Sequence, residues 1–459
     1  MPILVPKGSQ TRMAGRSWKN AANGNWSAST NWDTGVPVTT DTASITLNGL
    51  YTVDLDVDTT IVGLALGNTT AGSQTLILNG YTLTLNGAST VNSKGILNFN
   101  GGTLTGTGSL TANAGSTLIW SGGTQSGSGK TIVTGNLQIN DDNYYKNLDG
   151  RTLETRGNTT WTGNTLHLYG SNGATWNNTA SGSIDLQSDA DFYGDSSTTF
   201  NNAGTLTKSV GSTDGTDSSV ISALFNNSGT VEVQQGVLSL QGGGSSTGNF
   251  SIQSGGSLEF SGGTHTLGNS SSIDGAGKVR FSNGSTTEVG GAYNLTGTTE
   301  ITGGIANFGS SKAISTTNFA LSYGDLSGSD TVTTTNMVWS GGTQSGSGKT
   351  IVTASLQIND DNYYKNLDGR TLETRGNTTW TGNTLYLYGS NGATWNNAAS
   401  GSINLQSDAD FYGDSSTTFN NAGTLTKSLG VRWHRFVCNL CPLQQLWHRQ
   451  NPAGSTHFY

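Results

Sequence analysis

The chain has 459 residues, of which 67 are glycine, 32% are hydrophobic and only 11% are charged, with a formal net charge of −8. Long helices are excluded, because Gly, Ser, Thr and Asn are abundant and are poor helix formers. Wholesale disorder is excluded too, since 11 Trp, 14 Tyr and 13 Phe supply too much apolar surface for a solvated chain. The acidic balance, without any run of Lys or Arg, argues against a nucleic-acid partner. No stretch approaches the length of an apolar membrane span.

The first 17 residues lack the apolar core of a signal peptide, and we expect them to be disordered. Residues 18–60 form a Trp-rich module that contains Trp18, Trp26 and Trp32. The first coil of a stacked structure exposes its core and needs a cap, which large aromatic rings can supply. The alternative is that these three rings stack on sugars and bind a ligand.

Residues 61–430 alternate apolar and polar residues in short runs such as Thr82–Gly87, Ile96–Asn100 and Ser257–Gly263, each closed by Gly or Asn. Alternation predicts half-buried strands, and Gly and Asn permit tight corners. No proline occurs between Pro37 and Pro442, which favours uninterrupted sheet. We therefore predict an all-β protein, an elongated parallel β-helix (β-solenoid) with coils of roughly 20 residues.

Residues 120–211 recur almost unchanged at 339–430, 219 positions later. The six differences include His167, which becomes Tyr386, and Asp185, which becomes Asn404. Six tryptophans of the two copies are expected in the core or in side grooves: Trp120, Trp161, Trp176, Trp339, Trp380 and Trp395.

The segment Gly122–Thr131 resembles a phosphate-binding loop, but Thr124 stands where that pattern needs glycine. A strand-like run follows it instead of the helix that would hold phosphate. We expect a corner of a coil here and in its copy, not a nucleotide site.

Acidic residues are scarce, so their clusters are candidate sites. Oxygen-rich loops suit Ca²⁺, although Asp and Asn also form ordinary turns. The candidate metal ligands are Asp141, Asp142, Asp214 and Asp217. Paired acids also serve sugar-cleaving enzymes, and the fallback catalytic residues are Asp189, Asp191, Asp195, Asp408, Asp410 and Asp414. Against catalysis, these clusters are duplicated with the scaffold. His167 and His265 are expected to be surface strand residues.

The tail from Val431 to Tyr459 breaks the pattern, with Cys438, Cys441 and nearby histidines that suggest zinc. A one-base shift of the reading frame makes Arg432–Gln450 compatible with Asp214–Val231, the stretch that follows the first copy. We therefore interpret residues 431–459 as a frameshifted, non-native continuation of the second copy and expect no zinc site.

Several segments resemble repeats of large bacterial surface proteins: SWKNAANGNWSASTNWDTGVP, WSGGTQSGSGKTIV, LDGRTLETRGNTTW, FNNAGTLTKS and SGGTHTLGNSSSIDGAGKV. The chain is similar in this respect to haemagglutinin-like and autotransporter-passenger adhesins. The resemblance implies a parallel β-helix that is secreted or displayed at the cell surface, with glycans or a host or biofilm surface as partner. We expect a fragment of such an adhesin, whose export signal and anchor lie elsewhere. The alternative is a calcium-dependent β-helical hydrolase or lyase acting on a polysaccharide or another small extracellular substrate.

Overall fold

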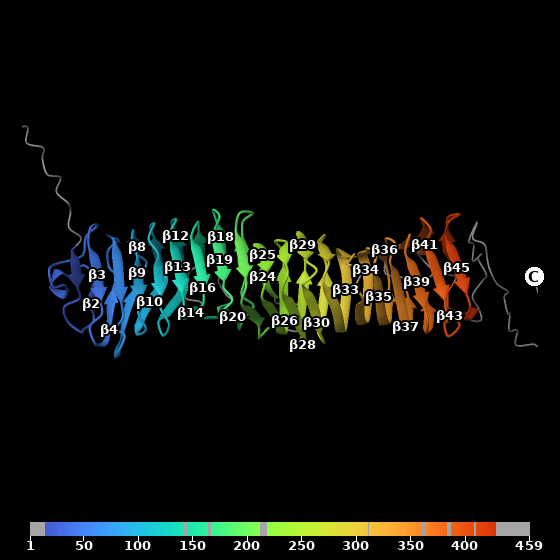
Figure 1. The fold of residues 1–459 in the computed structure, drawn as a ribbon, viewed down its shortest axis with the longest axis horizontal. Coiled ribbons are helices and arrows are strands. Elements are labelled where there is room, and N and C mark those ends of the chain that lie inside the picture. Colours follow the sequence, from blue (N-terminus) through green and yellow to red (C-terminus); the bar gives the residue numbers. More distant parts are fainter. Residues whose placement is uncertain are drawn as a thin grey trace, which may run out of the picture. The chain divides into compact units, whose positions relative to one another are not determined.

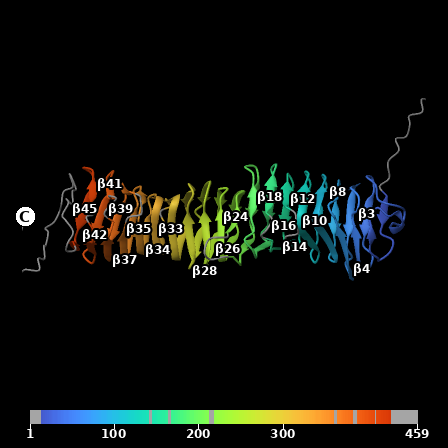
Figure 2. The ribbon, with the colours of Figure 1, turned by 180° about the vertical axis from the view of Figure 1, so that it is seen from behind.

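The computed structural model describes residues 14–140, 145–163, 167–211, 218–310, 312–359, 364–382, 387–407 and 410–427. These residues form 46 strands and one short 3-10 helix, η1 (Ser29–Asn31). The chain divides into two units, residues 1–242 and residues 243–459. Each unit is a stack of coils whose strands pair in parallel with the coils before and after (Figures 1 and 2).

The first unit has three faces, each a ladder of parallel strands. Face A consists of β2 (Gly24–Asn25), β4 (Gly49–Asp54), β7 (Gly72–Ile77), β10 (Gly95–Thr105), β12 (Thr117–Ser126), β14 (Asn136–Ile139), β17 (Asn158–Trp161), β20 (Ser183–Leu186), β23 (Thr205–Lys208) and β26 (Thr230–Leu240). Face B consists of β5 (Thr59–Ile61), β8 (Thr82–Leu85), the later halves of β10 and β12, β15 (Lys146–Asp149), β18 (Leu168–Ser171), β21 (Phe192–Gly194), β24 (Ser218–Ile221) and the later half of β26. Face C consists of β1 (Gly15–Ser17), β3 (Thr42–Ile45), β6 (Gly63–Leu66), β9 (Ser89–Val91), β11 (Leu110–Ala112), β13 (Lys130–Val133), β16 (Thr152–Thr155), β19 (Thr175–Asn178), β22 (Thr199–Asn202) and β25 (Leu224–Asn227).

The second unit is built in the same way, and its faces A′, B′ and C′ carry the sequences equivalent to A, B and C in the duplicated segment. Face A′ contains β31 (Lys278–Phe281), β40 (Asn377–Trp380), β43 (Ser402–Leu405) and β46 (Thr424–Lys427), with parts of β28 (Asn249–Phe260), β33 (Ala292–Phe308), β34 (Ile314–Ser327), β35 (Thr331–Trp339) and β37 (Lys349–Ile358). Face B′ contains β27 (Gly244–Ser246), β29 (Thr264–Leu267), β32 (Thr286–Val289), β36 (Gly342–Ser345), β38 (Lys365–Asp368), β41 (Leu387–Ser390) and β44 (Phe411–Gly413), with parts of β33 and β34. Face C′ contains β30 (Ser272–Gly275), β39 (Thr371–Thr374), β42 (Thr394–Asn397) and β45 (Thr418–Asn421), with parts of β28, β33, β34, β35 and β37.

The predicted fold class is confirmed: the structure is all-β, almost without helix, and its parallel strands stack as a β-solenoid with roughly 22 residues per coil. The first 17 residues were expected to be disordered, and strand β1 occupies the last three of them. No helix in the described ranges is long and apolar enough to cross a membrane.

In each unit, every second side chain along a strand points into the coil, and these side chains form an apolar core. Leu148, Leu153 and Leu186 are nearly fully buried, at 0 to 3% exposed. The tryptophans of the two copies were expected in the core or in side grooves, and they lie in the core, 0 to 2% exposed: Trp120, Trp161, Trp176, Trp339, Trp380 and Trp395. Burying one Leu or Phe side chain is worth about 1.5–3 kcal/mol, so stacked coils stabilise one another.

Asparagines add a polar ladder inside the first unit. Asn178 Nδ2 donates to Asn202 Oδ1 over 2.8 Å, and Asn202 Nδ2 donates to Asn227 Oδ1 over 2.8 Å. All three residues are buried. Because each amide pairs with the next coil, this column satisfies polar groups that burial alone would penalise.

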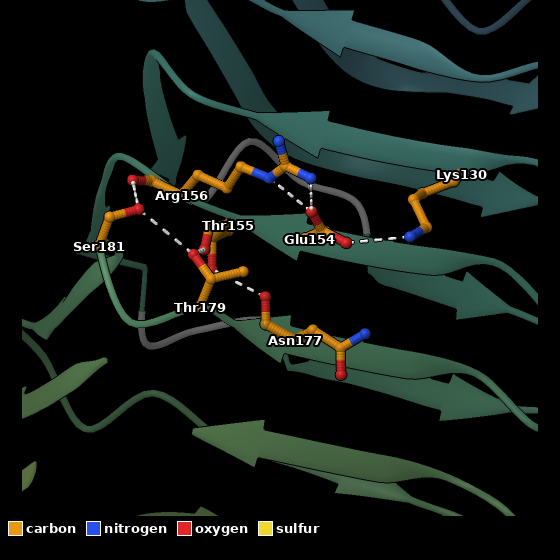
Figure 3. Close-up of polar contacts among 7 residues, drawn as sticks. All are labelled: Lys130, Glu154, Thr155, Arg156, Asn177, Thr179 and Ser181. Carbon is orange, nitrogen blue, oxygen red and sulfur yellow. Dashed lines mark hydrogen bonds and ion pairs between the residues drawn. The ribbon is translucent and has the colours of Figure 1, made fainter. Parts of the chain in front are cut away.

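Charged side chains tie neighbouring coils at the outer surface of face C. Glu154 accepts from Lys130 Nζ of the preceding coil over 2.9 Å and from Arg156 Nε over 2.5 Å (Figure 3). Partial burial pushes the pKa of Glu154 upward, but the hydrogen bonds from Lys130 and Arg156 outweigh it and hold the pKa below its usual value. The same triad recurs with Lys349, Glu373 and Arg375.

The expectation that His265 lies on the surface was wrong. His265 is only 3% exposed, lies 5.0 Å from the Phe260 ring between centroids, and places Nε2 2.8 Å from the Gly262 carbonyl. It occupies an inward position of β29, whose burial alternates residue by residue. In a strand of four residues, either the odd or the even positions point inward, and this choice decides whether His265 is buried. The presence of one polar residue does not show which set points inward.

Candidate functional site

A column of three tyrosines, here called the first tyrosine ladder (Tyr145, Tyr169 and Tyr193), lies on face B. Tyr169 and Tyr193 are partners in the β18–β21 register, and Tyr145 immediately precedes β15. Ring centroids are 5.7 Å apart for Tyr145 and Tyr169, and 5.8 Å apart for Tyr169 and Tyr193. Tyr145 and Tyr169 are 54% and 38% exposed. The ladder therefore presents neighbouring aromatic rings to solvent.

Local sequence explains the column. In Leu168-Tyr169-Gly170 and Phe192-Tyr193-Gly194, the apolar residue is buried in the core and the tyrosine points outward. Gly170 is required, because a Cβ there would lie 2.4 Å from Thr198 Cγ2 and 3.1 Å from the Phe192 ring. In-register pairing of β18 with β21 then places Tyr169 and Tyr193 about 4.8 Å apart along the stack. The β15 residue paired with Tyr169 is Asn147, and Tyr145, two positions earlier, contacts the Tyr169 ring from the side.

The second tyrosine ladder (Tyr364, Tyr388 and Tyr412) repeats this geometry on face B′. Its centroid separations are 5.7 Å and 5.8 Å. Tyr364 and Tyr388 are 53% and 39% exposed. The two ladders are thus the same surface built twice.

A histidine and an aspartate contact the first ladder. His167 Nδ1 lies 3.1 Å from Asp191 Oδ2, and the Tyr193 hydroxyl donates to the same oxygen over 3.0 Å. The imidazole packs edge-on against Tyr193, with centroids 5.0 Å apart. Burial, followed by the charge of Asp191, raises the pKa of Tyr193 to about 12, so this phenol stays protonated at neutral pH. Tyr386, at the position equivalent to His167, lies outside the described residues.

The three predicted catalytic acids of the first copy have separate partners. Asp189 accepts from the buried Lys208 Nζ over 2.9 Å, and Asp191 Oδ1 accepts from the Val220 backbone N–H over 2.8 Å. Asp195 accepts from the backbone N–H of Ser197 and of Asn172 and thus holds the corner after β21.

The pKa values of these acids are shifted in opposite directions. Burial raises the pKa of Asp191, whereas hydrogen bonds from Ser197 and Thr198 lower that of Asp195 to about 2. Asp195 is therefore an anion that shapes a turn.

In the second copy, Asp410 lies near the Tyr412 hydroxyl, 3.4 Å from oxygen to oxygen, and Asp414 caps the same corner as Asp195. Asp408 lies outside the described residues, as do the four candidate metal ligands Asp141, Asp142, Asp214 and Asp217. Within the ranges that the structure describes, no three His, Cys, Asp or Glu side chains converge on a possible metal site. The calcium hypothesis stays a prediction, and the zinc-like tail is likewise undescribed.

The tryptophans of the N-terminal module are buried, with Trp18, Trp26 and Trp32 at 0 to 2% exposed. Trp32 packs edge-on against both other rings, at centroid distances of 5.1 and 4.8 Å, and its Nε1 donates to the Trp26 carbonyl over 2.8 Å. These are positions of packed core residues. Sugar stacking on these rings would require the cluster to open.

The segment that resembles a phosphate loop surrounds a buried arginine. Arg151 is 0% exposed, and its guanidinium donates to the Ser126 carbonyl over 3.0 Å, to the Lys130 carbonyl over 3.3 Å and to Thr131 Oγ1 over 2.9 Å. Carbonyl oxygens here point at a cation, the reverse of a loop whose N–H groups cradle phosphate. The following strand, β13, fits the predicted coil corner.

Sequence reasoning missed the tyrosine ladders. The available signal was an apolar-Tyr-Gly tripeptide that occurs at 168–170 and 192–194 and again at 387–389 and 411–413. Comparisons with known proteins add no candidate residues: no family model, no curated protein and no solved structure matches this chain.

Proposed function

We propose that this chain belongs to a secreted or cell-surface β-solenoid that binds glycans or a host or biofilm surface through its two tyrosine ladders. The observation that carries the proposal is the duplicated column of exposed tyrosines on faces B and B′. A tyrosine ring has an apolar face and a polar edge, as a pyranose has, and ordering it costs little conformational entropy.

Repetition supports binding over turnover. Two equal surfaces on one chain can engage a repetitive polymer together, which raises avidity by about 10²–10⁴ without any new contact. Binding of this kind does not need one precisely arranged site, so a second copy of the segment adds a second binding surface.

The test uses the full chain and a panel of soluble and insoluble polysaccharides. Tyr145→Ala with Tyr169→Ala removes the two exposed rings of the first ladder, and Tyr364→Ala with Tyr388→Ala removes those of the second. We expect each double variant to keep measurable binding at reduced avidity and the quadruple variant to lose it. Tyr81→Ala is the matched control, because Tyr81 is 40% exposed and lies outside both ladders. Full binding by the quadruple variant, with an unchanged circular dichroism spectrum, would contradict the proposal.

One observation favours the enzymatic alternative. Asp191 Oδ2 lies 3.1 Å from His167 Nδ1, and burial raises the pKa of the Asp191 carboxyl, as it does for the general acids of some enzymes. If the chain is a hydrolase or lyase, Asp191→Asn should abolish turnover of a polysaccharide, and chelation of calcium should mimic the loss. We expect no turnover in either the parent or the variant. Turnover that Asp191→Asn abolishes while the fold persists would replace the binding proposal.

A further inference from the structure

Carboxylates flank the first tyrosine ladder on both sides. Asp189 and Asp191 precede Tyr193 on the side where the chain enters face B. On the other side, Asp149 Oδ1 accepts from Ser171 Oγ over 2.9 Å, and Asp195 accepts from the backbone N–H of Asn172 over 3.0 Å. On the entry side Asp189 is paired with Lys208 and Asp191 with His167, so Asp149 and Asp195 on the other side supply the acidic charge beside the rings.

The cations of the same coils do not offset this charge at the surface. Among the described residues of 145–211 there are four Lys and Arg side chains, and three of them, Lys146, Arg151 and Lys208, are 0% exposed. The fourth, Arg156, is ion-paired with Glu154 on face C. On face B of these coils an incoming ligand meets the tyrosine rings, carboxylates and the partly exposed His167 imidazole, because the exposed Arg156 lies on face C.

This surface suits a sugar that carries a positive charge. An ammonium group is attracted to the electron-rich face of a tyrosine ring, and carboxylates beside the ring add to that attraction. A uronic acid or a sulfated sugar would be repelled by the same carboxylates. A neutral sugar would gain only the stacking.

We propose that the tyrosine ladders recognise polysaccharides with free amino groups, that is, hexosamine polymers that are not N-acetylated. This inference rests on the proposed glycan-binding function and narrows its ligand class. The second ladder repeats the geometry: Asp368 Oδ1 accepts from Ser390 Oγ over 2.8 Å, and Asp414 accepts from the Asn391 backbone N–H over 3.0 Å.

The decisive probes are three hexasaccharides of equal length: glucosamine, N-acetylglucosamine and glucose. Their binding to the full chain is measured by calorimetry at pH 6 in 20 mM and in 500 mM NaCl. We expect the glucosamine hexamer to bind at least about tenfold more tightly than the other two in low salt. High salt should shrink that preference, because exposed charges are screened.

Variants separate a specific site from general attraction to an acidic protein. Asp149→Asn with Asp368→Asn removes one flanking charge from each ladder, and we expect the preference for glucosamine to fall at least about threefold while N-acetylglucosamine binding is unchanged. Asp274→Asn is the matched control, because it removes the same charge from an exposed position of β30.

Three outcomes would overturn the inference. Equal binding of the three hexamers, lost in the tyrosine quadruple variant, leaves the proposed function standing and rejects the preference for amines. Glucosamine binding that survives the quadruple variant assigns it to the net charge of −8 instead of the ladders. Absence of binding to every probe rejects the amine preference, and absence of binding to the wider polysaccharide panel rejects the proposed function too.

Discussion

The two copies of the duplicated segment, residues 120–211 and 339–430, lie in different units and still have the same internal geometry. The tyrosine centroids are 5.7 and 5.8 Å apart in both. Asn172 and Asn391 have φ angles of 54° and 53° at equivalent corners. Because a coil contacts only its neighbours, a stretch of several coils carries most of its own structural information.

The two copies differ in the residues of the preceding coil that contact the first coil of each copy. Arg151 Nη2 donates to the Gly108 carbonyl over 3.3 Å, whereas Arg370 Nη2 donates to the Asp330 carbonyl over 3.1 Å. The residue that accepts this hydrogen bond is glycine in one copy and aspartate in the other, but in both copies the acceptor is a backbone carbonyl oxygen. Burial lowers the pKa of each arginine to about 10, so both remain cations at neutral pH. The requirement at this position is thus a set of carbonyls, which many sequences can provide.

The largest expected effect comes from removing the buried arginines. Arg151→Met should destabilise its coils by about 3–5 kcal/mol, because several carbonyls and Thr131 lose their donor inside the core. Arg370→Met should cost a similar amount if the copies are equivalent. Native-state hydrogen exchange measures each effect separately, since peptides containing Gly135 or its counterpart Ala354 differ in mass. A loss below about 1 kcal/mol in either variant would show that the carbonyls find other donors.

A smaller effect should separate the copies at the asparagine ladder. Asn202 is 1% exposed and pairs with Asn178 and Asn227 on both sides, so Asn202→Ala should cost about 1–3 kcal/mol. Asn421 is half-buried and accepts from Asn397 over 2.7 Å. We expect Asn421→Ala to cost only about 0.5–1.5 kcal/mol. Hydrogen exchange of β23 and β46 checks the difference, and equal losses would mean that burial does not set the cost.

The exchange of His167 for the tyrosine of the second copy should change stability by less than about 1 kcal/mol. His167→Tyr removes a half-buried pair with Asp191 and leaves the ring spacing that the second ladder already has. Thermal unfolding measures this, with Tyr386→His as the reciprocal variant. A loss of several kcal/mol in only one direction would reveal that the two sites are not interchangeable.

The smallest expected effect concerns acid stability at the corners. Hydrogen bonds from Ser197 and Thr198 hold the pKa of Asp195 at about 2, and those from Ser416 and Thr417 hold the pKa of Asp414 below its usual range. A lowered native pKa gives stabilisation that is present above about pH 4 and is lost as the pH falls toward about 2. Carboxyl NMR titration should show both corners intact at pH 4. Titration of either carboxylate near pH 4 would contradict these contacts.

Alternation of apolar and polar residues, Gly and Asn at corners and the absence of proline from residues 38–441 were sufficient to predict the parallel β-solenoid. The sequence left two positions open for Trp120 and Trp176, the core or a side groove, and the structure buries both in the core. The duplication was visible as two nearly identical stretches of sequence. It led to the expectation that any surface on one copy occurs again on the other.

The tertiary structure decided which surface residues meet, because coil length varies and register depends on the whole stack. Tyr145, Tyr169 and Tyr193 are separated in sequence by corners and loops, and only the paired strands bring their rings within 6 Å. From its sequence alone, Arg151 would be taken for a surface cation, but in the structure carbonyl oxygens of the coil surround its guanidinium. His265 is buried because its strand takes one of two phases, and packing against the Phe260 ring selects it. The local sequence determines that a segment forms a strand. The coils above and below that strand determine which side chains lie beside its own on the surface.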